Sequence, residues 1–483
     1  MLFNSYIFIL LFFPFALIGR YGLNRLKNPI YAKFFLIAAS VLFCAYYHPS
    51  FALVLIGSVA VNYVLAGLMV KGDKPSKAFL VAGIVFDLAL LFVFKYLGFA
   101  VGTINGITGS SLAAPSILMP LGISYYTFGQ ISYLVDLYKG DIKKDSLTGH
   151  LLFISFFPKL AAGPIVRHLD LMPQFDDPAR SKPDQDYIAK GIYRFSTGLA
   201  KKVLLADTIS AAVDYGYSNI GALSSVECVI VAVLYSFQLY FDFSGYCDMA
   251  IGIANCLHID LPENFDVPYF ASSITEFWKK WHITLTGFLT KYIYIPLGGN
   301  RKGKSRTLLN IMIVYLISGF WHGADWSFVI WGIMHGIACC LYRVAGGLWD
   351  KLPKFIKVPC TFIYVTIAWI FFRADSTKDA FEFIRRMFTV GGTFGTELAH
   401  KFDVLELTYI EDHVGALRNL CAGFPYLNMI VILLICIFVL VIEKLLAGRK
   451  KSFSAVSAII CSVLLIWSII SLSGVSVFLY FNF

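Results

Sequence analysis

Long apolar stretches separated by short polar loops run along almost the whole chain. A stretch of about 18 or more apolar residues with few charges is a candidate membrane-spanning helix. Apolar stretches predict helices near residues 6–18, 30–47, 51–70, 78–99, 117–138, 191–213, 226–256, 308–321, 327–345, 356–372, 427–442 and 454–474.

Two segments depart from this pattern. Residues 151–166 are short for a full span and contain Pro158, Gly163 and Pro164, so they predict a re-entrant or interfacial segment. Residues 375–424 are polar and form the longest predicted loop.

Loops with basic residues alternate along the chain with loops that have none. No positive charge precedes the first apolar stretch, but Arg20 and Arg25 follow it, which is the reverse of a cleavable signal peptide. The loop at 71–77 is basic, whereas the turn at 48–50 has no Lys or Arg. The positive-inside rule therefore predicts an extracytoplasmic N-terminus. The basic run at 448–451 predicts that the last helix runs outward and leaves the C-terminus outside as well.

Composition agrees with the apolar pattern. The 483 residues are 58% hydrophobic and 14% charged, whereas soluble domains contain about 45–50% apolar and about 25% charged residues. This balance excludes a cytosolic enzyme, a disordered chain and a secreted disulfide scaffold. It predicts an all-α polytopic membrane protein. We expect one integral membrane domain over residues 1–483 with about 10–13 transmembrane or re-entrant helices.

The net charge and the spacing of the cysteines do not indicate a particular chemistry. The positive-inside rule explains the net charge of +10, so membrane lipid is an expected contact and nucleic acid is not. The ten cysteines form no C-x-x-C pair and no Cys/His ladder, so we expect neither a metal site nor a bound cofactor.

Candidate chemistry is concentrated between residues 235 and 336. Gln238 and Asp242 lie on one predicted helical face together with Tyr235 and Gly245. An acid within a membrane span usually faces the protein interior or a wet cavity, which makes Asp242 a site candidate. The alternative is a structural carboxylate that ties helices together, and this alternative is favoured for Asp242.

A Trp-Lys-Lys-Trp-His run follows a proline-broken segment. Ser273 and Glu276 predict a capping box at the start of a helix. Trp278 and His282 lie four residues apart on the apolar face of that helix, with Trp281 beside them. His282 is therefore either a hydrogen-bonded structural residue or a catalytic one.

In residues 297–306 a pair of adjacent glycines, Gly298 and Gly299, is followed by four basic residues. Asn300, Arg301 and Lys302 could contact the phosphates of a nucleotide-bearing donor such as coenzyme A. A cytoplasmic turn that obeys the positive-inside rule is the favoured interpretation, because the glycine spacing is not that of a P-loop.

A second Trp-His pair, Trp321-His322, ends an apolar stretch between Gly319 and Gly323. Two histidines in apolar surroundings, without a third ligand, favour acid–base chemistry over metal binding. His335 is a third, weaker candidate. No G-x-S-x-G motif is present, so nothing supports a hydrolase-type serine nucleophile.

Residues 238–336 resemble the membrane-bound O-acyltransferase family, most closely the branch with the membrane component of alginate O-acetyltransferase. The most branch-specific run is Tyr-Ile-Pro-Leu-Gly-Gly-Asn-Arg at 294–301. The stretches that carry the resemblance are Gln238–Asp248, Glu263–Tyr269, Ser273–His282, Tyr292–Arg301 and Gly319–Trp331.

The resemblance implies a helical membrane fold around a central funnel or tunnel. It implies that His322 is a general base that activates a hydroxyl for attack on an acyl thioester, and that His282 orients or polarises the reactants. Supporting or tunnel residues are expected to be Gln238, Asp242, Asn264, Trp278, Trp281 and Trp321.

The resemblance also implies the reaction partners. The expected donor is acetyl-CoA or an acyl-carrier thioester on the cytoplasmic side. The expected final acceptor is a cell-surface polysaccharide, reached through a separate extracytoplasmic SGNH or serine-esterase-like acetyltransferase. These partners place the protein in a bacterial cytoplasmic membrane.

The chain ends in an aromatic tail, residues 477–483, that contains Tyr480. The tail resembles that of some acetylating relatives, so Tyr480 is a candidate to take the acyl group and pass it on. An aromatic belt at the outer interface is the alternative.

Two other functions stay open. A multi-span transporter or flippase would use the intramembrane Asp and His as ligands, but no internal repeat supports it. A non-catalytic scaffold for a polysaccharide export complex is the other.

Overall fold

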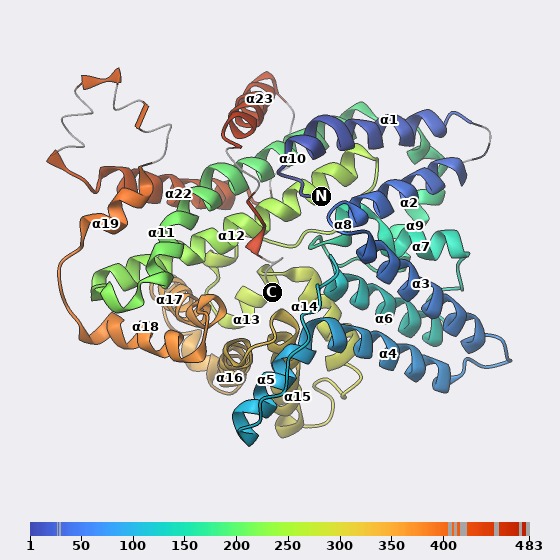
Figure 1. The fold of residues 1–483 in the computed structure, drawn as a ribbon, viewed down its shortest axis with the longest axis horizontal. Coiled ribbons are helices and arrows are strands. Elements are labelled where there is room, and N and C mark those ends of the chain that lie inside the picture. The colour runs from blue at the N-terminus through green and yellow to red at the C-terminus, as the bar shows by residue number, and fades with distance from the viewer. Residues whose placement is uncertain are drawn as a thin grey trace. The chain divides into compact units, whose positions relative to one another are not determined.

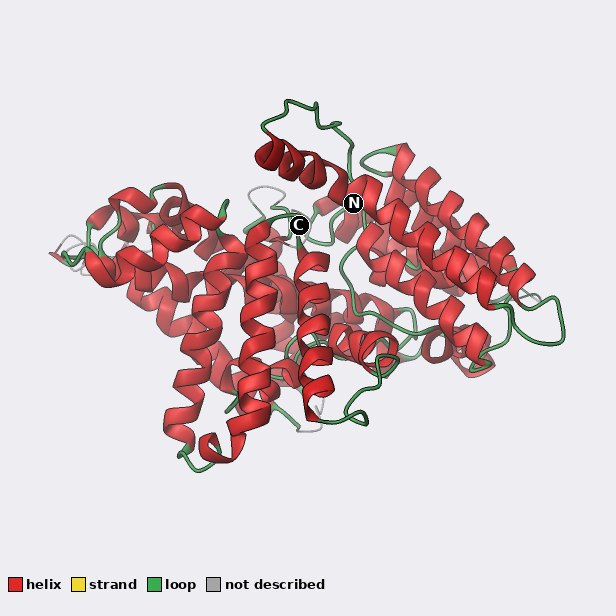
Figure 2. Ribbon diagram, turned by 90° about the horizontal axis from the view of Figure 1, so that it is seen from below, coloured by secondary structure: helices red, strands yellow, loops and turns green. Residues whose placement is uncertain are grey.

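The computed structural model describes residues 1–26, 28, 30–403, 408–409, 413–415, 423–448, 454–472 and 476–479. These residues form helices joined by loops, with no strand among them (Figure 2). Their contacts group the chain into two units. Unit 1 is Met1–Leu199, Tyr246–Glu263 and Phe453–Phe483, and unit 2 is Ala200–Gly245 and Asn264–Ser452.

Unit 1 is built mainly from the N-terminal helices (Figure 1). Neighbouring helices in the sequence pack on one another, because short loops keep antiparallel helices adjacent. The helices of unit 1 are η1 Phe8–Phe12, α1 Phe13–Leu23, α2 Ile30–Ala45, α3 Pro49–Met69, α4 Lys77–Leu91, η2 Phe92–Tyr96, α5 Leu97–Thr108, α6 Ile123–Lys139, α7 Leu147–Ser155, α8 Phe157–Leu160, α9 His168–Asp176, η3 Pro178–Ser181, α10 Gln185–Ala200 (but for its last residue) and α23 Ala455–Ile470.

Unit 2 holds the motif region. The first part of the α12 helix, Ser225–Cys256, belongs to unit 2, and its last part belongs to unit 1. The other helices of unit 2 are η4 Lys201–Ala206, α11 Asp207–Ser218, η5 Ile220–Ala222, η6 Pro268–Phe270, α13 Ile274–Lys280, α14 Ile283–Leu289, η7 Thr290–Tyr294, α15 Lys304–His322, α16 Trp326–Trp349, α17 Lys354–Arg373, α18 Thr377–Thr389, α19 Thr396–Ala399, η8 His400–Phe402 and α22 Leu427–Leu446.

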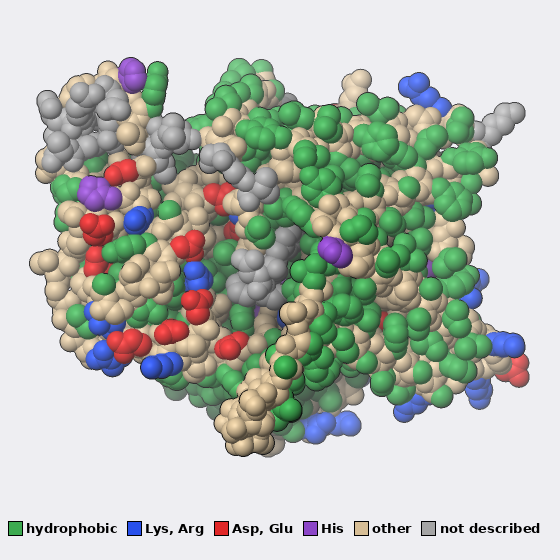
Figure 3. Space-filling model, viewed as in Figure 1, with side chains coloured by type: hydrophobic (Ala, Val, Ile, Leu, Met, Phe, Trp, Pro, Cys, Tyr) green, Lys and Arg blue, Asp and Glu red, His purple; other side chains and the backbone are tan. Residues whose placement is uncertain are grey.

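The helices have the length and composition of a polytopic membrane protein. Six in the described part of the chain are long and apolar enough to cross a membrane, and three shorter ones are also apolar. Hydrophobic side chains cover much of the outer surface over α1 to α4, and Lys and Arg gather at its edges (Figure 3). An outward apolar surface of this extent suits a lipid environment.

Most predicted helices are confirmed, with shifted ends. The helix predicted at 226–256 is α12, and the one predicted at 78–99 continues through η2 and α5 to Thr108. The helix predicted to begin near residue 117 begins only at Ile123, because Pro120 precedes it and Gly122 adopts a left-handed conformation at its N-cap.

Two predictions are wrong. Residues 375–424 are not one loop, because α18 lies within them, capped by the Ser376 hydroxyl, which accepts a hydrogen bond from the Asp379 N–H at 3.1 Å. The second concerns the helix around His282, described below. The segment predicted as re-entrant is broken, with α7 and α8 on either side of Phe156.

Candidate active site

The helix that carries the first Trp-His pair is interrupted at His282. The α13 helix ends at Lys280, and His282 has φ 45° and ψ 53° as the N-cap of α14. The prediction that Trp278 and His282 lie on one continuous helix is therefore wrong. Left-handed conformation in a residue with a Cβ is uncommon and gathers at functional sites.

The start of α13 agrees with the predicted cap in part. The Ser273 hydroxyl accepts a hydrogen bond from the Glu276 N–H at 3.1 Å, as predicted. The Glu276 carboxylate binds the N–H and hydroxyl of Ser272 at 2.8 and 2.6 Å instead of the N–H of Ser273. This cap fixes where α13 begins, about two turns before the break at His282.

Asn264 fixes the His282 ring. The Asn264 Oδ1 lies 3.0 Å from His282 Nδ1 and accepts from the Thr284 N–H at 3.2 Å and the Thr284 hydroxyl at 3.0 Å. An amide oxygen only accepts, so Nδ1 of neutral His282 carries the proton and Nε2 carries the lone pair. Burial lowers the pKa of His282 well below its usual range, and nearby His322 lowers it further. His282 is therefore a neutral ring of one defined tautomer.

His322 is the last residue of α15 and only 3% exposed. Its Nδ1 lies 2.6 Å from the Ser318 carbonyl oxygen, one turn back on the same helix. Because a carbonyl oxygen only accepts, Nδ1 of the neutral ring carries the proton. The lone pair is then on Nε2, which is the nitrogen able to take a proton.

An aromatic cluster brings the two Trp-His pairs together. The Trp321 ring lies 6.1 Å from His282 and 4.8 Å from His322, centroid to centroid. His322 also packs on Trp331 at 4.9 Å and Phe372 at 5.4 Å. The sequence-predicted histidines thus share one buried indole.

His335 belongs to the same cluster but has the opposite tautomer. The Trp278 indole N–H donates to His335 Nδ1 at 3.2 Å, so the proton of neutral His335 is on Nε2. The Trp331 ring lies 4.8 Å from His335. Trp331 links His322 to His335, and sequence reasoning missed it as a site residue because one more apolar aromatic in a span carries no signal.

Trp281 packs away from these contacts. Its ring lies 5.0 Å from Trp369 and 5.5 Å from Phe277, and it is 1% exposed. Trp278 contacts Tyr315 at 5.2 Å besides His335. Of the three predicted tryptophans, Trp321 touches both site histidines.

Two glycines let α15 and α16 cross closely beside His322. A Cβ on Gly319 would lie 2.5 Å from the Phe328 carbonyl oxygen, and one on Gly332 would lie 2.5 Å from that of Tyr315. Side chains at either position would separate the two backbones. The crossing therefore sets where α15 presents His322.

Asp242 is buried in an ion pair. Its carboxylate lies 2.6 Å from the Lys202 Nζ, which also contacts Asp207 at 2.8 Å. Gln238 is buried one turn earlier on α12. Sequence reasoning missed Lys202 because nothing in a single sequence pairs two residues on different helices.

The basic loop lies at the other end of α15. Asn300, Arg301 and Lys302 are exposed, and the Asn310 amide binds the Gly299 carbonyl at 2.9 Å. A rise of about 1.5 Å per residue puts Lys304 roughly 27 Å along the helix from His322. The structure does not bring the loop and the histidines together.

Tyr480 lies outside the described residues, but the tail just before it is in place. The Asn4 amide donates to the Ser476 carbonyl at 2.9 Å, and the Phe478 ring lies 4.6 Å from Tyr246. Phe478 is 1% exposed. This part of the tail is therefore anchored to the interior of unit 1.

Together these observations define a multi-pass helical membrane protein with a buried histidine pair in an aromatic setting. The chain belongs to the membrane-bound O-acyltransferase family, whose model matches residues 134–375. It is thus an acyltransferase, and the resemblance of residues 238–336 to this family is confirmed.

The chain is similar to several named bacterial proteins. The peptidoglycan O-acetyltransferase of Helicobacter pylori is 36% identical over 517 aligned positions, covering 100% of this chain and 98% of that protein. The probable alginate O-acetylase AlgI of Pseudomonas aeruginosa is 37% identical over 81% of this chain and 75% of its own length. The teichoic acid D-alanyltransferase of Streptococcus thermophilus is 31% identical over 53% of this chain and 61% of its own.

Proposed function

We propose that the chain takes an acetyl group from a cytoplasmic thioester, acetyl-CoA, and passes it across the membrane for O-acetylation of a cell-surface polysaccharide. Two of the similar proteins are named as acetylating enzymes of polysaccharides. Peptidoglycan is the first acceptor to test, because the protein named for it aligns over nearly the full length of both chains.

The observation that carries the proposal is the His322 tautomer. Because its Nδ1–H donates a hydrogen bond to the Ser318 carbonyl oxygen, His322 has Nε2 as its basic nitrogen. In the proposed step Nε2 takes the proton of an acceptor hydroxyl, and the oxygen attacks the thioester carbonyl carbon. The carbon–sulfur bond breaks, the thiolate leaves and takes the proton from His322, and an ester and free coenzyme A result.

His282 positions the reactants in this proposal. Burial favours its neutral ring, so its Nε2 lone pair can accept a hydrogen bond from a hydroxyl without changing charge. Asn264 fixes that orientation through His282 Nδ1. His282 is therefore an orienting residue, and His322 is the base.

Tyr480 is the proposed first acceptor of the acetyl group. The anchored tail supports this, since Phe478 is buried rather than lying in an outer aromatic belt. A separate extracytoplasmic SGNH or serine-esterase-like acetyltransferase would then complete transfer to the polysaccharide. Intact mass of the C-terminal peptide under turnover tests the step. An acetyl-sized increase that disappears in Tyr480→Phe supports the relay, and its absence in the wild type refutes it.

Purified full-length protein with radiolabelled acetyl-CoA tests the reaction. We expect wild type to release or take up label, and His322→Ala to lose this activity. His400→Ala is the matched control, because His400 is an exposed histidine far along the sequence from the site. Equal background signal from wild type and His322→Ala would overturn the acetyl-CoA reaction. Transport in liposomes without acyl turnover would favour the transporter instead.

A further inference from the structure

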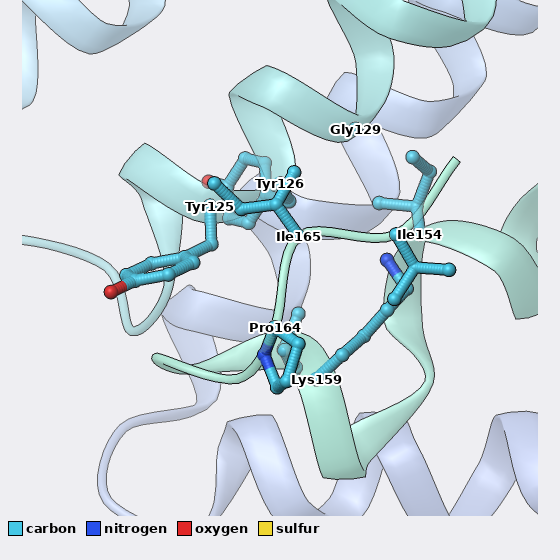
Figure 4. A pocket seen from close by; sticks show the side chains of 9 residues that line it. Tyr125, Tyr126, Gly129, Ile154, Lys159, Pro164 and Ile165 are labelled. Carbon is cyan, nitrogen blue, oxygen red and sulfur yellow. The ribbon is translucent and has the colours of Figure 1, made fainter. Parts of the chain in front are cut away.

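A small pocket in unit 1 is built around a lysine. Its lining comes from α6, from the end of α7 and from the segment that contains α8. The lining residues are Tyr125, Tyr126, Gly129, Ile154, Lys159, Leu160, Pro164, Ile165 and Val166. In Figure 4 the Lys159 side chain runs along one side and ends near Ile154, with Tyr125 and Tyr126 opposite.

The segment around Lys159 is held by backbone contacts. The Phe157 N–H donates to the Ser40 hydroxyl at 3.1 Å, and the Ala162 N–H donates to the Tyr246 hydroxyl at 3.3 Å. A Cβ on Gly122 would lie 2.2 Å from the Leu160 carbonyl oxygen, so only a glycine lets α6 start this close. The pocket is therefore defined by fixed backbone.

Lys159 has no acidic partner among the described residues. Its residue is 8% exposed, and its Nζ lies 4.6 Å from the centroid of the Phe153 ring. Burial lowers the pKa of this ammonium, and no charged neighbour opposes the effect. A buried lysine without a counter-ion is unfavourable in the empty protein. Such a residue is more typical of a binding site than of packing.

A second polar group in the lining also has no hydrogen-bond partner. The Tyr126 hydroxyl is buried and unbonded within the described part of the chain, and Tyr126 is 1% exposed. Buried polar atoms in native proteins are usually satisfied, so an unsatisfied one in a pocket wall points to a ligand atom or a water. The rest of the lining is mostly apolar.

We propose that this pocket binds a short-chain carboxylate such as acetate. The single ammonium of Lys159 matches one negative charge. The walls of Ile154, Leu160 and Val166 suit a methyl group rather than the second charge of a phosphate. The small size of the pocket restricts the ligand to a few heavy atoms. The site is independent of His322 and of the transfer reaction, so either can fail alone.

Thermal unfolding of the full-length protein in detergent tests the proposal, with sodium acetate, sodium pivalate and neutral acetamide as probes and sodium chloride at matched ionic strength. A ligand that binds only the folded state raises the unfolding midpoint. We expect acetate to give a saturable rise in wild type and acetamide and pivalate to give none.

Two lysine variants assign the effect. Lys159→Met should lose the acetate-dependent rise, whereas Lys144→Met should keep it, because Lys144 is an exposed lysine over the Tyr63 ring at 4.2 Å. Lys159→Met should unfold no earlier than wild type without acetate, because it removes a buried amine that has no acidic partner among the described residues. An acetate shift that persists in Lys159→Met, or is absent in wild type, overturns the proposal.

A third variant keeps the test decisive if Lys159→Met does not fold. Gly129→Ala retains the lysine and adds a methyl group that would lie 3.1 Å from Ile154 Cδ1 in the pocket wall. It should reduce the acetate shift. An unchanged shift in Gly129→Ala would place acetate elsewhere.

Discussion

At the residue scale, Asn264 fixes the orientation of the His282 ring through a hydrogen bond to Nδ1. Asn264→Leu removes the acceptor of three hydrogen bonds. We expect it to lower the free energy of unfolding by about 1–3 kcal/mol and to abolish most turnover. Asn264→Asp keeps an acceptor oxygen and should restore folding.

The pH profile separates positioning from folding. A carboxylate beside Nδ1 favours the imidazolium, so Asn264→Asp should raise the pKa of His282. The acid limb of activity should therefore move to higher pH relative to wild type. If Asn264→Asp shows the wild-type profile, the ring of His282 does not act through this contact.

A second residue-scale prediction concerns the buried ion pair of Asp242 with Lys202. Asp242→Asn removes one of the two carboxylates that contact the buried Lys202 ammonium and should destabilise unit 2 by about 3–5 kcal/mol. The double variant Lys202→Met, Asp242→Leu should recover much of that loss, because it removes both deeply buried charges and leaves only the more exposed Asp207 carboxylate without Lys202. Denaturant unfolding measures both. Full stability but no turnover in Asp242→Asn would make Asp242 a site residue instead.

At the element scale, the crossing of α15 and α16 sets the place of His322. Gly332→Ala puts a methyl group against the Tyr315 carbonyl oxygen and should lower the free energy of unfolding by about 1–3 kcal/mol. Turnover should fall with it, since α15 must move. Gly347→Ala, on the same helix, meets no atom within 4 Å and is the matched control. Equal behaviour of the two variants would contradict the close crossing.

Several elements could be predicted from the sequence and others could not. The α12 helix follows from a long, mostly apolar run, and the α15–α16 region from Gly319, Gly323 and the Trp-His motif. The break at His282 could not, because the apolar spacing of Trp278 and Leu285 suits one helix. The break depends on Asn264, whose carbonyl accepts the Ile283 N–H at 3.0 Å. The apolar pattern did not predict the amphipathic α18, because the polar residues on one face of this helix lower its mean hydropathy.

The candidate active site also contains residues that the sequence predicts and residues that it does not. His322 and His282 carry recognisable motifs, whereas Trp331 and Lys202 gain their roles only from what lies beside them in space. Tautomers also depend on partners such as the Ser318 carbonyl, which no pattern predicts.

At the scale of the whole molecule, the orientation of the chain in the membrane is the open prediction. Basic loops predict that Ser111 lies outside and Lys74 inside. Both residues are exposed in loops. In a background of Cys360→Ser and Cys421→Ser, Ser111→Cys should react with an impermeant maleimide in intact cells, and Lys74→Cys only after permeabilisation. The opposite labelling would invert the predicted topology.

The chain divides into two units, whereas the sequence predicts a single domain. The α12 helix and the run from α10 to η4 pass from one unit to the other without a loop. Continuous helices make independent folding of either unit unfavourable. One integral membrane domain stays the prediction for residues 1–483.

The most direct test of the acyl-transfer mechanism is thiol release from acetyl-CoA by wild type and His322→Ala, with and without added imidazole. If His322 is the base, the variant turns over about 10²–10⁴-fold more slowly. Imidazole then restores part of the rate, because it fills the space of the missing ring, and His400→Ala stays at the wild-type rate. Thiol release by His322→Ala at the wild-type rate would contradict His322 as the base.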